Sequence, residues 1–167
     1  MTDRGSHTPQ GIAVGPDVAD DGAMSTDINE RSTEDLVEQY VALWNEGDPA
    51  ARAAMIRQLW GPDGEHVLDP PDDLIKAAQD LGFATAGLEV KGYAALERRA
   101  ARAYDEFVRP GEHRFRARAN AVRLRDLVKF GWEMVRTADE QVVGVGLEVL
   151  QLAPDGRIAV DYQFVEG

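Results

Sequence analysis

The hydrophobic pattern of the chain changes its period near His113, and this change limits the folds that are possible. Before it, apolar residues recur at helical spacing in four stretches: 33–46, 49–60, 73–82 and 92–108. After it, apolar and polar residues alternate in four stretches separated by turn signals: 113–122, 127–135, 141–152 and 157–165. One short strand-like run, 66–68, precedes Asp69, Pro70 and Pro71. Helices followed by a meander predict an α+β fold with helices packed on one face of an antiparallel sheet.

Charge and composition exclude several classes of function. A net charge of −12 argues against general affinity for nucleic acid or for an anionic membrane. The absence of cysteine excludes disulfides, thiolate metal ligands and cysteine nucleophiles. No apolar run approaches the roughly 20 residues of a membrane span, and the first residues lack the pattern of a signal peptide. A cytoplasmic protein is therefore expected.

The chain divides into a leader and one domain. Residues 1–32 are rich in Gly, Asp, Ser and Thr and show no apolar periodicity, which predicts a disordered leader. Met24 is an alternative start that the sequence leaves open. Residues 33–167 are long enough to form a single domain with a real core.

The third alternating stretch suggests a ligand pocket. Glu148 shares a strand face with Gly144 and Gly146, and two glycines inside a strand often mark a place where something needs room. An unpaired carboxylate among apolar neighbours is costly, so Glu148 is expected to be neutral, paired or in contact with a ligand. The residues expected to line this pocket are Trp44, Phe130, Trp132, Met134 and Gly146.

Several short motifs together resemble a known superfamily. They are Tyr40-Val-Ala-Leu-Trp-Asn-Glu-Gly-Asp48, the strand ending in Asp69-Pro70, Gly92-Tyr-Ala-Ala-Leu96, and the four-stranded meander. Residues 33–167 resemble the nuclear transport factor 2-like superfamily, which includes ketosteroid isomerases, SnoaL-like polyketide cyclases and limonene-type epoxide hydrolases. The resemblance implies a cystatin-like α+β roll: a cone of curved antiparallel sheet, of four to six strands, with about three helices on its concave face.

The resemblance also implies roles for individual residues. Tyr40 falls at the tyrosine donor of ketosteroid isomerases, Asp69 at their general base and Glu148 at their protonated second oxyanion donor. Glu148 and Asp161 resemble the two acids of the epoxide hydrolase Asp-Arg-Asp set. Gly146 occupies the arginine position of that set, which argues against an epoxide hydrolase.

Each of these residues also has a structural interpretation. Tyr40 could be a core residue, Asp69 a turn residue and Asp161 the structural partner of Glu148. Asp69 would point into the cone if Val67, which has the same parity, packs inward. His66 would then face the other way and play a minor role. Three scattered histidines predict no metal site, and no cofactor motif is present.

Two classes of function stay open. One is a cofactor-independent isomerase, cyclase or hydratase that acts on an apolar carbonyl-type substrate. The other is a non-catalytic module that binds a small apolar or amphipathic molecule, or that dimerises. Residues 72–91 are expected to cover the cavity mouth. An apolar outer row predicts a homodimer; it comprises Val143, Val145, Leu147 and Val149.

Overall fold

The computed structural model describes residues 31–70, 72–82 and 88–166, so most of the predicted leader lies outside the described residues. Its helices are α1 (Thr33–Asn45), α2 (Pro49–Leu59), α3 (Asp72–Asp80), α4 (Tyr93–Ala103) and the π-helical turn η1 (Tyr104–Val108) that continues α4. Its strands are β1 (Trp60–Leu68), β2 (Leu88–Lys91), β3 (His113–Ala117), β4 (Val122–Leu124), β5 (Leu127–Arg136), β6 (Val142–Leu152) and β7 (Ile158–Glu166).

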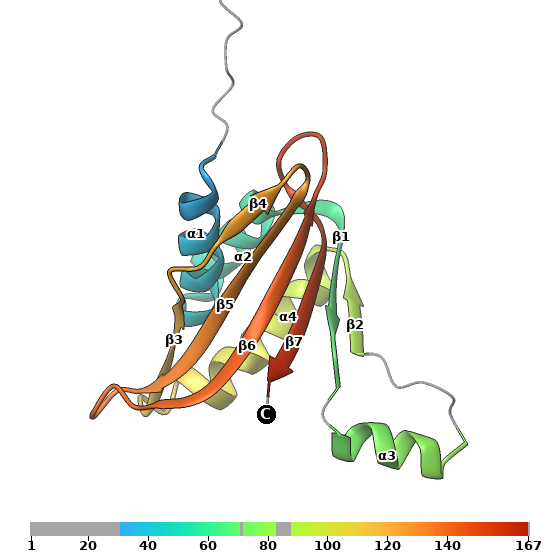
Figure 1. Ribbon diagram of the computed structural model, residues 1–167, viewed down its shortest axis with the longest axis vertical. Helices are drawn as coiled ribbons and strands as arrows, with labels where there is room; N and C mark the ends of the chain where they lie inside the picture. The colour runs from blue at the N-terminus through green and yellow to red at the C-terminus, as the bar shows by residue number, and fades with distance from the viewer. Residues whose placement is uncertain (1–30, 71, 83–87, 167) are drawn as a thin grey trace, which may run out of the picture.

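The strands form one curved, open sheet with α1, α2 and α4 on one of its faces (Figure 1). The strand order is β2-β1-β7-β6-β5-β3, and β4 pairs with β5. The predicted α+β class and the curved sheet are confirmed. Two details differ: the described residues form seven strands where four to six were expected, and β1 pairs with β7 in parallel. Strand β1 directly follows α2 in the helical half of the chain, while β7 is the last strand. Parallel neighbours need a long connection, and the residues between β1 and β7 provide it.

Local sequence explains where the two N-terminal helices begin. The Ser32 side chain accepts a hydrogen bond from the backbone N–H of Asp35, which caps α1. The Asp48 side chain accepts from the N–H groups of Ala50 and Ala51 at the start of α2, where Pro49 costs no hydrogen bond. These caps fix the starts of α1 and α2, which are joined by a short link and contact each other.

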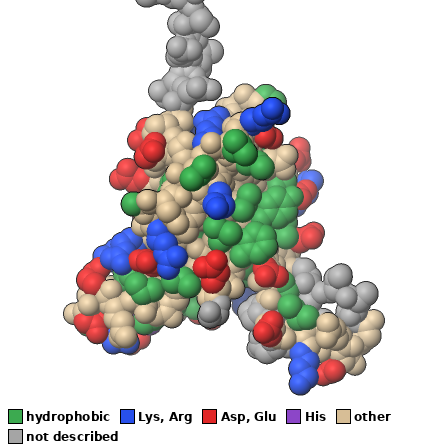
Figure 2. All heavy atoms as spheres, viewed as in Figure 1, with side chains coloured by type: hydrophobic (Ala, Val, Ile, Leu, Met, Phe, Trp, Pro, Cys, Tyr) green, Lys and Arg blue, Asp and Glu red, His purple; other side chains and the backbone are tan. Residues whose placement is uncertain are grey.

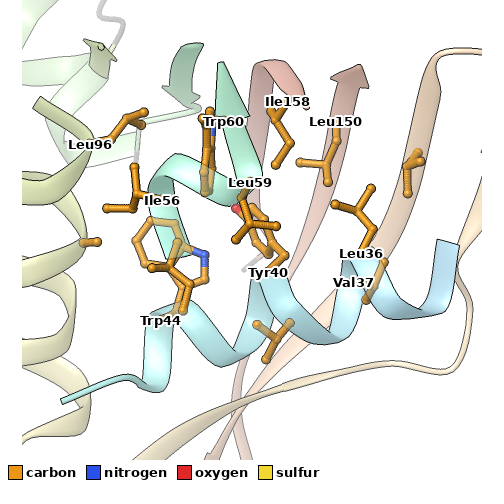
Figure 3. Close-up of a cluster of buried hydrophobic side chains, with 14 of the residues drawn as sticks. Leu36, Val37, Tyr40, Trp44, Ile56, Leu59, Trp60, Leu96, Leu150 and Ile158 are labelled. Carbon is orange, nitrogen blue, oxygen red and sulfur yellow. The ribbon is translucent and has the colours of Figure 1, made fainter. Parts of the chain in front are cut away.

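The hydrophobic core joins α1, α2 and α4 to β1, β6 and β7 (Figure 3). The Tyr40 ring lies at its centre, with ring centroids 5.6 Å from Trp60 and 5.4 Å from Phe130. Leu36, Leu150 and Ile158 extend the core toward the β6–β7 turn (Figure 3). The opposite end of the sheet, near the β5–β6 turn, is left for a cavity.

The expected lid is not confirmed. Helix α3 lies apart from the body of the molecule, beyond the ends of β1 and β2 (Figure 1). No residue of 72–82 whose side chain the structure describes (72, 75–77 and 79–82) lines the cavity, and residues 83–87 lie outside the described residues. Within the described part of the chain, no helix is long and apolar enough to cross a membrane.

Candidate functional site: a buried carboxylate pair beneath an apolar cavity

Two acids on neighbouring strands form the centre of the site. Glu148 on β6 and Asp161 on β7 both point to the helix face of the sheet, where each is fully buried. The Tyr40 hydroxyl of α1 donates a 2.7 Å hydrogen bond to Asp161 Oδ2. We refer to Glu148 and Asp161 as the carboxylate pair. The structure therefore brings together Tyr40, Glu148 and Asp161, three of the four predicted catalytic residues.

The surroundings of Glu148 favour its protonated form. Burial, together with the charge and hydrogen bonding of Asp161, holds the pKa of Glu148 well above its usual range. Asp161 Oδ2 accepts the Tyr40 O–H. Among the described residues, Glu148 Oε2 and Asp161 Oδ1 have no hydrogen-bond partner, and a proton on Glu148 would satisfy both. Glu148 therefore keeps its proton to a higher pH than an ordinary glutamate.

The pair sits in a polar network that is closed off from bulk solvent. Burial and the neighbouring acids raise the pKa of Tyr40 well above its usual value, so its hydroxyl remains a donor. His66 of β1 lies behind Asp161, with Nε2 3.8 Å from Asp161 Oδ2 and its ring centroid 5.6 Å from that of Trp44. Burial lowers the pKa of His66 more than Asp161 raises it, so the imidazole is neutral at pH 7.

A cavity of about 670 Å³ opens above Glu148. Its wall is mainly apolar, and it comes from α1, α4, η1 and strands β1, β3, β5, β6 and β7. The polar part of the wall begins with Glu148, whose Oε1 accepts a 2.8 Å hydrogen bond from the Gln163 amide. The Gln163 amide oxygen in turn accepts a long 3.4 Å hydrogen bond from Arg99 Nη2. A chain of three polar side chains therefore runs from the carboxylate pair along the cavity wall.

The predicted lining residues are divided between the cavity and the core. Trp44, Trp132 and Met134 line the cavity. Phe130 instead lies in the core, fully buried against Tyr40. Gly146 lies beneath the Trp132 indole, which occupies the space that the missing side chain leaves. Phe130 and Gly146 therefore support the cavity from behind and do not line it.

Asp69 does not join the carboxylate pair. It is exposed at the end of β1, its backbone N–H donates to Gln163 O, and it is not among the described residues that line the cavity. The inward row of β1 consists of His66 and Leu68, while Val67 pairs with Tyr162 on the outer face. The parity assumption for this strand was therefore wrong, and with it the expected direction of Asp69.

Sequence reasoning missed His66 and Arg99. The sequence did contain a sign that His66 faces inward. The other face of the same strand carries Glu65, Val67 and Asp69, and a face with two acids is better suited to solvent. For Arg99 the sequence offers neighbouring arginines at 98 and 102, and only the packing of α4 decides which of them reaches the cavity. In the described ranges, no cluster of three or more histidines and acids could hold a metal ion.

Comparison with known proteins supports the fold. No family model matches the chain, and no curated protein matches it. Similar solved structures include a proposed isomerase of the SnoaL-like family from Agrobacterium tumefaciens C58, with a TM-score of 0.62 and 20% identity over 79% of this chain and 95% of that chain. A nuclear transport factor 2-like protein of unknown function from Exiguobacterium sp. 255-15 has a TM-score of 0.55 and 18% identity over 78% and 98%. A SnoaL-like protein of unknown function from Burkholderia thailandensis E264 has a TM-score of 0.54 and 16% identity over 81% and 95%.

At these identities the likeness establishes the fold. The chain has the nuclear transport factor 2-like fold, in the form found in SnoaL-like proteins, as its motifs predicted.

The buried titratable groups predict an unusual pH dependence of stability. The folded protein keeps a proton on Glu148 that the unfolded chain releases above pH ~4.3, so this group lowers stability as pH rises from there through its raised folded pKa. His66 has a lowered pKa, so it lowers stability as pH falls below ~6.5. Glu148→Gln removes only the first effect, because an amide can donate to Asp161 without ionising. We expect the variant to unfold at higher urea concentration than the wild type at pH 8 and at nearly the same concentration at pH 4.

The control for this prediction is Glu38→Gln, which changes an exposed glutamate on α1. It should leave the difference between pH 8 and pH 4 unchanged. A wild-type protein whose stability is the same as that of Glu148→Gln at both pH values would show that Glu148 ionises normally.

Proposed function

We propose that the protein is a cofactor-independent enzyme of the isomerase, cyclase or hydratase kind, which acts on a small apolar carbonyl compound by acid/base chemistry. One observation carries this proposal: a carboxyl group with a raised pKa, Glu148, forms part of the wall of an apolar cavity large enough for a small organic molecule. A carboxyl group that keeps its proton to a higher pH than usual can act as a general acid there.

The proposed chemistry uses the proton that Glu148 carries. Glu148 can give this proton to a substrate carbonyl oxygen, and in its ionised form it can accept a proton from the adjacent carbon. The Tyr40 O–H on Asp161 stabilises the negative charge that the pair then carries. His66 and Trp44 exclude water from the rear of the pair, and this low-dielectric setting strengthens each of these interactions. The similar Agrobacterium structure, described as a proposed isomerase, is compatible with this chemistry.

The test is proton exchange next to a carbonyl group. Purified protein is incubated in D₂O with a panel of bicyclic ketones such as 2-tetralone, and loss of the α-proton signal is followed by NMR. The proposal predicts exchange above the buffer rate for at least one ketone that also binds the cavity. Ketones that bind without any accelerated exchange would contradict the proposal.

The second candidate is a non-catalytic binding module, and one observation favours it. Of the four polar groups in the network, only Glu148 lines the cavity, while Tyr40, His66 and Asp161 lie behind the wall. Such a network could serve only to hold the core together. In the exchange experiment this function would appear as tight ketone binding with the buffer rate of exchange.

The outer face of the sheet carries a proposed dimer contact. The outer patch lies over β1, β6 and β7, where apolar side chains gather on the surface (Figure 2). It consists of Val67, Leu147, Val149, Tyr162 and Phe164. Of the row expected from the sequence, Val143 and Val145 instead line the cavity. Tyr162 and Phe164 remain 38% and 40% exposed in the single chain. Adjacent exposed rings of this kind are typical of a surface that a second copy covers.

Sedimentation equilibrium tests the dimer. We expect twice the 18.3 kDa chain mass at micromolar concentration, and a monomer for Phe164→Glu, which places a carboxylate in the patch. The control Arg102→Glu adds a carboxylate to exposed α4 and should leave the dimer intact. A monomeric wild type would rule the dimer out.

A further inference from the structure

Arg99 is a cation in a cavity that is otherwise apolar or acidic. Among the described residues that line the cavity it alone carries a positive charge, and the acids of that lining are Glu148 and Glu166. Glu166 is exposed at the last described position of β7. It pairs with Val145 of β6, whereas Asp161 of the carboxylate pair is opposite Leu150. A positively charged side chain in an apolar wall costs free energy of desolvation unless it has a partner there.

The protein itself provides only weak partners for the Arg99 guanidinium. No carboxylate of the described chain forms an ion pair with Arg99, although other arginines and one lysine of the described residues pair with carboxylates. Its one hydrogen bond within the described residues is the 3.4 Å contact with Gln163, out of five N–H donors. Its guanidinium carbon lies 5.4 Å from the centre of the Trp44 ring, a distance that allows a cation–π contact.

Arg99 does not contact Glu148, the proposed acid, directly. Gln163 stands between Arg99 and Glu148, donating to the acid and accepting from the arginine. Arg99 therefore reaches Glu148 only through the Gln163 amide and forms no direct ion pair with it. Apolar side chains from three other elements face it across the cavity: Phe107, Phe115, Trp132 and Met134.

We propose that Arg99 anchors the carboxylate of an amphipathic acid, whose apolar body lies in the cavity against the neighbouring side chains of Phe115 and Met134. This inference rests on the proposed function only in that the cavity takes a small molecule, and it adds the class of that molecule. The guanidinium fork matches a carboxylate in a bidentate pair, which fixes the orientation of the ligand as well as its charge. The reacting carbonyl would lie near Glu148, one side chain away from the anchor.

The experiment compares two probes with the same skeleton, 2-naphthylacetate and 2-(2-naphthyl)ethanol, by isothermal titration calorimetry at pH 7. The wild type should bind the acid at least 10-fold more tightly than the alcohol. Arg99→Gln should lose that preference, while its affinity for the alcohol changes less than threefold. Arg99→Lys should retain part of the preference, because the charge remains and the fork is lost. Arg98→Gln removes an exposed arginine from the neighbouring position and should behave as the wild type.

Three outcomes would overturn the inference: equal binding of the two probes by the wild type, no binding of the acid, or an unchanged preference in Arg99→Gln. A melting temperature for each variant shows that it is folded, and Arg99→Lys keeps the comparison valid if Arg99→Gln is not. Failure here is distinct from failure of the proposed function. A preference for the acid without ketone exchange would leave an acid-binding protein, and exchange without the preference would leave an enzyme for neutral ketones.

Discussion

Glu148→Gln is expected to reduce ketone proton exchange by about 10²–10⁴-fold, the usual contribution of a general acid/base group. The amide can keep the hydrogen bond from Gln163 and can donate to Asp161, so the cavity should retain its shape. It can no longer deliver or accept a proton. Ligand affinity should therefore change less than threefold, and the loss should appear in kcat. NMR exchange rates at saturating ketone, together with calorimetric affinities, measure both quantities.

The same variant should be more stable than the wild type at neutral pH. A residue whose removal stabilises the fold and abolishes turnover is a functional residue, since a merely structural acid would show the opposite stability change. Asp69→Asn gives the contrast, because Asp69 is exposed and does not line the described cavity. It should leave exchange within about twofold of the wild type, and a large loss in Asp69→Asn would contradict this assignment.

Gly146→Ala is expected to be the most destabilising small substitution in the sheet. A Cβ at this position would lie 2.6 Å from the backbone oxygen of Phe164 and would overlap the Trp132 indole. The Phe164 oxygen belongs to the paired backbone of β7 and cannot move away as a flexible side chain can. The Trp132 indole would have to turn toward the cavity that it lines. Overpacking of this kind costs about 3 kcal/mol, or roughly 6–12 °C in melting temperature for a chain of this size.

The matched control is Gly144→Ala, two residues away on the same face of β6. There the new Cβ would lie 3.4 Å from Met134 Cε, the flexible end of a side chain. We expect its melting temperature to fall by less than about 3 °C. Equal losses in the two variants, measured by calorimetry, would show that Gly146 does not support the Trp132 wall.

The long alternating stretches allowed the sequence to predict half of the site. In β6 and β7 the period of two fixes which side chains share a face, so Glu148 and Asp161 were both expected inward. Tyr40 followed from helical spacing together with the family resemblance. These three residues were predictable because they lie on long elements, which contain enough repeats to show which positions face inward.

Strand β1 behaved differently, because the sequence predicted only three of its nine residues. That run offered two rows with one apolar residue each, and the choice of Val67 over Leu68 reversed the expected directions of both His66 and Asp69. A register shift between Trp60 and Glu65 also breaks the alternation that might have corrected the choice. The parallel pairing of β1 with β7 joins residues about 100 apart in sequence, and no local pattern reports such a contact.

The protonation of Glu148 is the central claim, and carbon NMR tests it directly. Protein labelled with ¹³C at the glutamate side-chain carboxyl carbon is titrated from pH 3 to pH 9, and the Glu148 signal is assigned by its absence in Glu148→Gln. We predict that this signal keeps the chemical shift of a protonated acid to a pH well above about 4.3, the ordinary pKa of a glutamate side chain. A Glu148 signal that titrates with the exposed glutamates would contradict the account, because the cavity would then hold an ordinary carboxylate and no general acid.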